Sequence, residues 1–192
     1  MAVEWTAELI EQLRFYWEHH FRPRLGGLTD DEYFWEPVPD CWSIRPLADG
    51  STGTVRFMVD WAWPAPTPAP FTTIAWRLGH IGSAVLALRA NAHFGDGALT
   101  IDQIEWPGTA DDAIRFVEAG YTAWMQGLAT LSEADLAREV GPAEGPYSKA
   151  PFATLILHIN REIMHHGAEV ALLRDLYRAS GAGGPAPSDL AP

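Results

Sequence analysis

The chemically richest part of this sequence lies between residues 157 and 170, where three histidines and two glutamates fall within what should be one amphipathic helix. Glu162 and His166 are four residues apart, so their side chains point the same way from adjacent turns. A carboxylate and an imidazole on consecutive turns form half of a site for a divalent metal. The sequence therefore raises the question of whether another helix supplies the other half.

A helical wheel at about 100° per residue separates these side chains. One continuous apolar stripe is predicted from Phe152, Ile156, Ile159, Ile163, Val170 and Leu173. His166 falls inside the stripe, and Glu162 falls on its edge. The other polar residues are predicted to lie away from it, with His158 and His165 on the flank and Asn160 and Arg161 toward solvent.

The pairing of Glu162 with His166 has two explanations. A buried carboxylate needs a cation or several hydrogen-bond donors, because its removal from water is otherwise costly. Either a protonated His166 or a metal ion meets that need, and the spacing leaves both open. Taken singly, the histidine is equally explained as a hydrogen-bonded core residue, and the glutamate as a solvated flank.

The candidate third ligand is His80, in the middle of another predicted helix. The apolar face of that helix is predicted from Ile74, Leu78, Ile81 and Val85. His80 falls on the opposite face with Trp76 and Ser83, so it points into the core only if the helix is buried on both sides. The few polar residues of this helix allow such burial, and composition leaves His80 open between core residue and ligand.

Four long helices are expected to position these residues. Helical spacing and capping residues predict them over residues 4–22, 72–94, 109–131 and 151–179, with a short helical turn at 29–35. Four such helices with almost no sheet predict an all-α four-helix bundle over residues 1–179. The Gly-, Ala- and Pro-rich residues 180–192 are expected to form a disordered tail.

The connection between the first two helices is rich in proline and tryptophan. Residues 54–61 alternate like an extended segment, and the four prolines that follow exclude a regular helix: Pro64, Pro66, Pro68 and Pro70. We expect a crossing loop that is packed onto the bundle by Phe57, Trp61 and Trp63.

Composition limits the classes of function. The chain has 192 residues and a net charge of −12, which disfavours nucleic-acid binding because phosphate backbones repel an acidic protein. No run of 18 apolar residues is present, and the N-terminus lacks a signal peptide, so no membrane contact and a cytoplasmic location are expected. Cys41 is the only cysteine, and it is expected to be a buried small hydrophobe.

Three segments resemble the DinB-like superfamily, which includes thiol-dependent bacterial S-transferases and the N-terminal domain of mycothiol-dependent maleylpyruvate isomerase. They are Phe71–Ile81, His158–Val170 and the Trp-Ser-x-Arg-Pro turn within Asp40–Pro46. The resemblance covers roughly residues 5–178. It implies an up-down-down-up bundle, consistent with a long connection over residues 95–108.

The resemblance also implies a divalent metal held by one histidine of the second helix and by two residues four apart on the fourth. In this sequence they are His80, Glu162 and His166. Many family members have histidine where this chain has Glu162, whereas the maleylpyruvate isomerase branch has glutamate. Two imidazoles and one carboxylate leave coordination positions open, and they suit Zn²⁺ first, with Ni²⁺ and Fe²⁺ as alternatives.

The leading functional hypothesis is a thiol-dependent S-transferase or isomerase acting on a small-molecule substrate. The metal would bind a low-molecular-weight thiol, such as mycothiol, and favour its thiolate. An aromatic pocket for the electrophile is expected from Trp42, Trp61, Trp63 and Trp76, and His165 is a further candidate substrate contact.

Two alternatives belong to other classes. One is a small metal-dependent hydrolase, for which Glu169 or His165 would be the general base. The other is a non-catalytic, metal-binding or stress-associated bundle that forms a homodimer.

Overall fold

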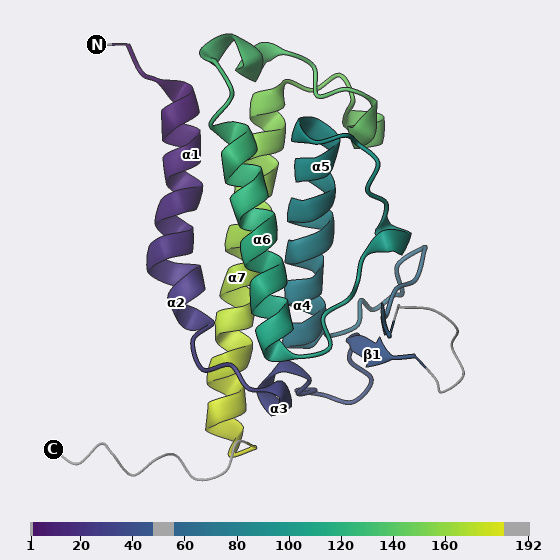
Figure 1. Cartoon of the computed structure of the whole chain (residues 1–192). Helices are drawn as coiled ribbons and strands as arrows, with labels where there is room; N and C mark the ends of the chain where they lie inside the picture. The colour runs from purple at the N-terminus through teal and green to yellow at the C-terminus, as the bar shows by residue number, and fades with distance from the viewer. Residues whose placement is uncertain (1, 48–55, 183–192) are drawn as a thin grey trace, which may run out of the picture.

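Four long helices packed side by side dominate the computed structural model, which describes residues 2–47 and 56–182 (Figure 1). Two of the four contain a π-helical segment, so that each is a composite of three pieces. The four are α1 (Trp5–Tyr16) with η1 (Trp17–Phe21) and α2 (Arg22–Arg24); α4 (Ile74–His80) with η2 (Ile81–Ala87) and α5 (Leu88–Phe94); α6 (Ala110–Leu128); and α7 (Phe152–Ser180). The predicted four-helix architecture is confirmed.

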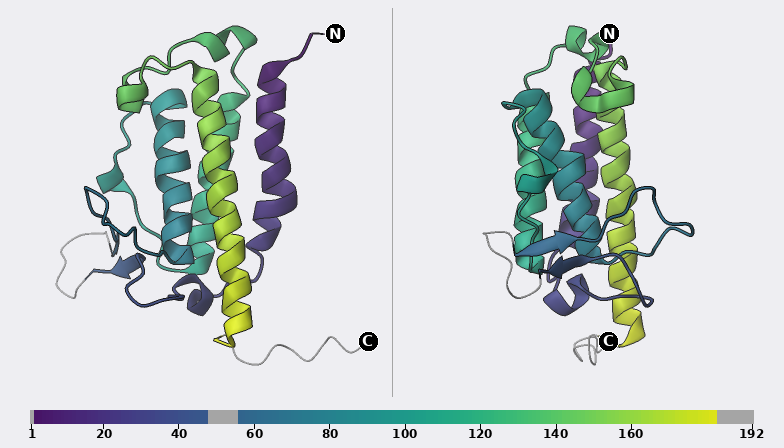
Figure 2. Two further views of the ribbon diagram at one scale, coloured as in Figure 1. Left: turned by 180° about the vertical axis from the view of Figure 1, so that it is seen from behind. Right: turned by 90° about the vertical axis from the view of Figure 1, so that its right-hand side faces the viewer.

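The order of helix directions follows from the connections. Figure 1 shows α1 and α7 running downward and the α4–α5 helix and α6 running upward. The chain between α5 and α6 therefore returns along the length of the bundle, with the short η3 (Ile101–Gln103) on its way. From behind, α7 lies between α1 and the α4–α5 helix (Figure 2), and this position lets α7 contribute side chains to both neighbours.

A small hairpin accompanies the helices, so the all-α prediction is incomplete. Strand β1 (Ile44–Pro46) pairs in antiparallel fashion with β2 (Phe57–Val59), and Arg45 lies opposite Met58. The sequence predicted an extended segment over 54–61 but no partner for it; residues 54 and 55 lie outside the described part of the chain. The predicted turn at 29–35 is confirmed as α3 (Asp30–Tyr33), which the Thr29 side chain caps.

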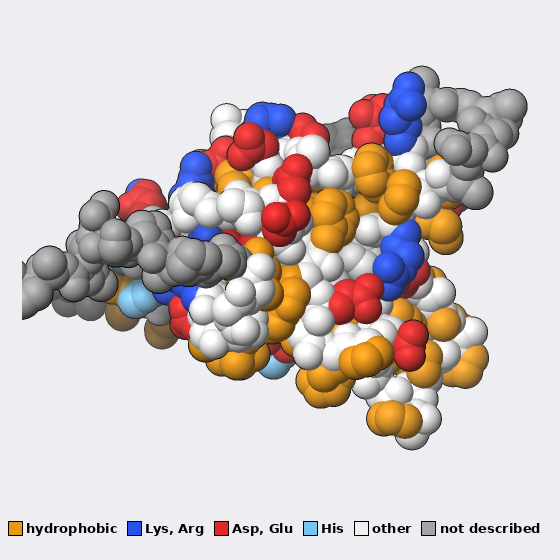
Figure 3. Space-filling view, turned by 90° about the horizontal axis from the view of Figure 1, so that it is seen from below, with side chains coloured by type: hydrophobic (Ala, Val, Ile, Leu, Met, Phe, Trp, Pro, Cys, Tyr) orange, Lys and Arg blue, Asp and Glu red, His pale blue; other side chains and the backbone are white. Residues whose placement is uncertain are grey.

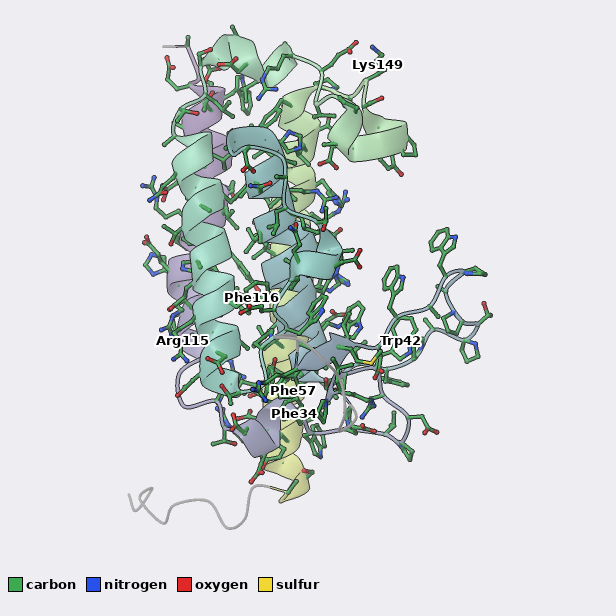
Figure 4. The ribbon with its side chains drawn as sticks, turned by 45° about the vertical axis from the view of Figure 1, so that its right-hand side comes forward. Phe34, Trp42, Phe57, Arg115, Phe116 and Lys149 are labelled. Atoms are coloured by element: carbon green, nitrogen blue, oxygen red, sulfur yellow. The ribbon has the colours of Figure 1, made fainter. Side chains whose placement is uncertain are left out.

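The loop after β2 differs from its prediction. Phe57 packs against the core as expected, but Trp61 and Trp63 are 67% and 84% exposed, so their predicted packing onto the bundle is wrong. Figure 4 shows why: the proline-rich segment projects away from the helices, with Trp42 at its base. Trp61 contacts Trp42 instead, with ring centroids 6.3 Å apart.

The core lies between the four helices, and the predicted stripe of α7 is largely confirmed. Five of its six members are fully buried, and Leu173 is partly buried against them. One prediction on this helix is wrong, because Asn160 does not point to solvent. Its side chain is buried, and its amide Nδ2 donates to the backbone oxygen of Leu9 at 2.9 Å, which joins α7 to α1.

The remaining connections close the ends of the bundle. Two 3₁₀ helices, η4 (Glu133–Ala137) and η5 (Pro142–Tyr147), join α6 to α7. Helix α7 ends at Ser180, and Gly181 follows in the left-handed region at φ 73°. Residues 183–192 of the predicted tail lie outside the described part of the chain.

The surface carries both acidic and apolar groups. On the lower end of the molecule, acidic and hydrophobic side chains lie next to one another (Figure 3). Cys41 is buried as predicted, with its thiol hydrogen-bonded to the backbone oxygen of Val38. Among residues 2–47 and 56–182, no helix combines the length and apolar character needed to span a membrane.

Candidate metal centre

Two helices bring the three predicted ligands together. His80 is the last residue of α4, while Glu162 and His166 lie one turn apart on α7. The Nε2 atom of His166 lies 3.2 Å from Oε2 of Glu162, and Nε2 of His80 lies 4.0 Å from the same oxygen. One ligand atom from each residue lies within 4.8 Å of the others, so this cluster can hold a metal ion.

The orientation of His80 follows from burial of its helix on both sides. Trp76 and Ser83, which the wheel placed with His80 on the face opposite Ile74, are buried, with 9% and 1% exposed. The hairpin and Trp106 cover this second face; a Cβ built on Gly79 would lie 3.4 Å from the Trp106 ring. His80 is therefore partly buried, with 27% of its side chain exposed toward a cavity.

The environment of His80 favours its neutral form. The Trp76 ring stacks on the imidazole, with centroids 5.3 Å apart and planes 14° from parallel. Burial lowers the pKa of His80 to about 4, and the adjacent His166 contributes to the decrease. A neutral imidazole carries a free nitrogen lone pair, which is the form that binds metals.

A second glutamate fixes the other imidazole. Nδ1 of His166 lies 2.7 Å from Oε2 of Glu169, and 3.3 Å from Nη1 of Arg77. Since a carboxylate only accepts, and this contact is the shorter, Nδ1 carries the hydrogen and donates it to Glu169. Arg77 in turn contacts Glu169, with Nε 3.0 Å from Oε2.

This tautomer has a direct consequence for the cluster. With its hydrogen on Nδ1, His166 presents a bare Nε2 lone pair to a carboxylate oxygen of Glu162 only 3.2 Å away. Two lone pairs at this distance require a proton or a cation between them. The donor set of two imidazole nitrogens and one carboxylate fits a divalent ion such as Zn²⁺ and leaves coordination positions open.

The neighbouring histidines occupy different positions. His158 lies beside the cluster, with Nδ1 3.6 Å from Oε1 of Glu162, and accepts a hydrogen bond from Arg161. Desolvation lowers the pKa of His158. The side chain of His165 is 65% exposed and lines a separate groove between α1 and α7. His165 also forms a second grouping with His166 and Glu169, but the Arg77 guanidinium already pairs with that carboxylate.

The four tryptophans of the expected substrate pocket separate into three environments. Trp61 and Trp76 line a cavity of about 650 Å³ that His80 also lines. Trp42 does not line it, but packs behind it, with its ring centroid 6.0 Å from that of Trp76. Trp63 stands apart from this cavity on the exposed loop.

Sequence analysis missed two residues that shape the site. The sequence suggests Glu169 only as a general base, and it gives Arg77 no role in the site. The available signal was spacing, because Glu169 follows His166 by three residues and Arg77 precedes His80 by three. That both would converge on one imidazole depends on how α4 packs against α7, which spacing alone does not determine.

The fold and the site define a four-helix bundle with a candidate metal centre built by side chains of facing helices. A family model described as the DinB superfamily matches residues 12–170, which include all three candidate ligands, so the chain belongs to the DinB superfamily. No curated protein and no solved structure matches the chain.

Proposed function

We propose that His80, Glu162 and His166 hold a divalent metal, zinc first among the candidates, and that the protein transfers a low-molecular-weight thiol to a small electrophile. The observation that carries the proposal is the pair of imidazole nitrogens facing one Glu162 oxygen, beside a cavity large enough for a substrate. Membership of the DinB superfamily supports the same ligand set.

Each residue of the site has a role in this proposal. A bound divalent cation supplies Lewis acidity, which lowers the pKa of a thiol. Glu162 contributes the negative charge that favours a cation over a neutral ligand. Glu169 fixes the His166 tautomer, and Trp76 stacks on the ring of His80.

The reaction conserves atoms and charge. The thiol loses its proton to solvent, a sulfur–carbon bond forms, and the bond between that carbon and its leaving group breaks. With monochlorobimane as the electrophile, the products are a fluorescent thioether, chloride and a proton. The cavity is lined mainly by apolar side chains, which favours binding of an apolar electrophile.

The test begins with elemental analysis of the purified protein, followed by assays with monochlorobimane and mycothiol, bacillithiol or glutathione. We expect metal-dependent loss of at least one thiol, and His80→Ala and His166→Ala should abolish both metal binding and thiol consumption. His19→Ala is the control, because His19 is exposed on η1. Metal-loaded protein that consumes none of the three thiols would overturn the transferase proposal.

The alternatives have less support in the geometry. A hydrolase needs a free general base near the metal, but Glu169 is engaged by Arg77 and His166, and His165 points to solvent. Turnover of esters without added thiol would identify that class. Stoichiometric metal with no turnover of either kind would identify a metal-binding bundle without catalysis.

A further inference from the structure

The cavity beside His80 has walls from three parts of the chain. Trp76, His80 and Ala84 contribute from the α4–η2 helix, Trp61 from the loop after β2, and Trp106 from the connection that leads to α6. Its volume of about 650 Å³ falls within the range of pockets for drug-sized ligands, roughly 300–1,000 Å³.

The cavity has few polar groups, and two of them are already hydrogen-bonded within the protein. Ser83 donates its hydroxyl hydrogen to the backbone oxygen of Gly79 at 2.6 Å, so it offers little to a ligand. The Trp76 indole N–H donates to the backbone oxygen of Asp60 at 2.9 Å, which fixes that ring as a wall. The remaining surface is mainly aromatic and aliphatic, so apolar contact must dominate recognition.

Charge further restricts the ligand. Among the described residues that line the cavity, none is lysine or arginine, and the acidic Asp102 lies exposed at its edge. An anionic group bound here would lose its hydration without gaining a lysine or arginine partner from the lining, and Asp102 would repel it.

We propose that this cavity binds an uncharged, apolar small molecule with an aromatic or branched aliphatic body, and that it rejects anionic analogues of the same shape. This inference rests on the proposed function in one respect, since the ligand would be the electrophile whose reactive end lies at His80. Trp61, which is 67% exposed without a ligand, becomes more buried when the cavity is filled.

A pair of fluorescent probes tests the proposal on the protein as purified. N-phenyl-1-naphthylamine is uncharged, and 8-anilino-1-naphthalenesulfonate has the same ring system with an added sulfonate. We expect the uncharged probe to bind with a stoichiometry of about one per chain and at least about tenfold more tightly than the sulfonate. Monochlorobimane, added without thiol, should displace it. Equal affinities for the two probes would overturn the proposal.

Variants locate the binding. Ala84 lines the cavity and is only partly buried, so Ala84→Trp fills the space without rebuilding the core, and should reduce binding of the uncharged probe about tenfold or more. Ala92→Trp is the matched control, because Ala92 is exposed on α5 and does not line the cavity. Binding that survives Ala84→Trp unchanged would overturn the assignment to this cavity.

A third variant isolates the charge effect. Asp102→Asn removes the acidic group at the rim. The variant should bind the sulfonate more tightly, so the ratio of the two probes' dissociation constants should fall by roughly twofold or more. An unchanged ratio would contradict the role given to Asp102.

Metal content and thiol consumption, measured on the same preparations, separate this inference from the proposed function. Probe binding without thiol consumption would retain the cavity and overturn the transferase. Thiol consumption without probe binding would retain the transferase and overturn the assignment of the ligand to this cavity.

Discussion

Glu169 determines which nitrogen of His166 faces the candidate ligands. Its Oε2 atom accepts the Nδ1 hydrogen at 2.7 Å, which leaves Nε2 free to face Glu162. Carboxylate partners of metal-binding histidines hold the ring in place and raise its basicity. The arrangement makes Glu169 a positioning residue for the candidate centre.

We therefore expect Glu169→Ala to weaken zinc binding about 10- to 100-fold, with unchanged helix content. Glu169→Gln should lose less zinc affinity than Glu169→Ala, because the amide oxygen still accepts the hydrogen bond from Nδ1 of His166. Titration with a chromogenic competing chelator measures the change. Asp175→Ala is a matched control, since Asp175 lies on α7 like Glu169, pairs with Arg24 of α2 at 2.5 Å, and is not part of the cluster. Zinc affinity equal to the wild type in Glu169→Ala would contradict the role of Glu169.

The spacing of Glu162 and His166 could be predicted from the sequence because it is a property of one helix. The position of His80 could not, because a wheel describes one buried face, and α4 is buried on two. Asn160 was misplaced for a related reason. Its amide is satisfied by the Leu9 carbonyl of another helix, and a single-helix pattern contains no information about that partner.

At the scale of elements, the close approach of η2 and α6 fixes the position of His80 along the length of the bundle. Helix η2, which follows His80 directly, packs on α6 through Gly120. A Cβ built on Gly120 would lie 2.9 Å from Cβ of Leu86 and 3.3 Å from the backbone oxygen of Gly82. Neither atom is the end of a flexible side chain, so the two helices would have to separate.

Gly120→Ala should therefore lower the free energy of unfolding by about 1–2 kcal/mol, because overpacking exceeds the gain in helix propensity. Gly26→Ala should change it by less than about 0.5 kcal/mol, since its Cβ would meet only the Pro23 oxygen at 3.4 Å. Urea denaturation measures both. A Gly120→Ala variant more stable than the wild type would show that the helices have room to adjust.

The partly buried carboxylate of Glu144 connects η5 to the α4–α5 helix. Glu144 accepts from His93 at 2.9 Å and contacts Arg89 at 3.3 Å. The hydrogen bond from His93 and the charge of Arg89 lower the pKa of Glu144 despite its partial burial. Since the folded pKa lies below the unfolded value of about 4.3, the stabilisation is present above that pH and is lost as the pH falls through the folded pKa.

Glu144→Gln should consequently cost about 1–3 kcal/mol at pH 7, and the difference from the wild type should shrink as the pH falls below about 4.3. Denaturant unfolding at a series of pH values tests both the size and the direction. Glu139→Gln is the control, because Glu139 and its partner Lys149 are both well exposed. If the difference in free energy of unfolding between the wild type and Glu144→Gln grew toward acidic pH, the lowered pKa of Glu144 would be contradicted.

The sequence predicts one strand of the hairpin but not its pairing. The alternation at 57–59 indicated a strand, but ten residues separate it from its partner β1, and three residues carry too little pattern to specify pairing. The tryptophans of the following loop are expected from the sequence to pack that loop onto the bundle. They are exposed because the prolines lead the chain away from the helices.

For the whole molecule, one buried ion pair joins distant parts of the sequence. Arg174 on α7 and Glu32 on α3 are 2% and 4% exposed, and the guanidinium donates to both carboxylate oxygens at 2.7 and 2.9 Å. The same guanidinium donates to the backbone oxygens of Arg24, the last residue of the first helix, and of Gly26 just beyond it. The pair thus holds the first helix, α3 and α7 together at one end of the bundle.

Arg174→Met should lower the free energy of unfolding by about 3–5 kcal/mol, because it leaves the Glu32 charge buried without a partner. Adding Glu32→Gln should recover part of that loss, since the uncompensated charge is removed while the orphaned backbone oxygens remain. Arg178→Met, on the exposed side of the same helix, should stay within about 0.5 kcal/mol of the wild type. Guanidinium chloride unfolding of the four proteins provides the comparison. If the double variant is no more stable than Arg174→Met, the loss comes from the backbone oxygens and not from the stranded carboxylate, and the role of Glu32 is contradicted.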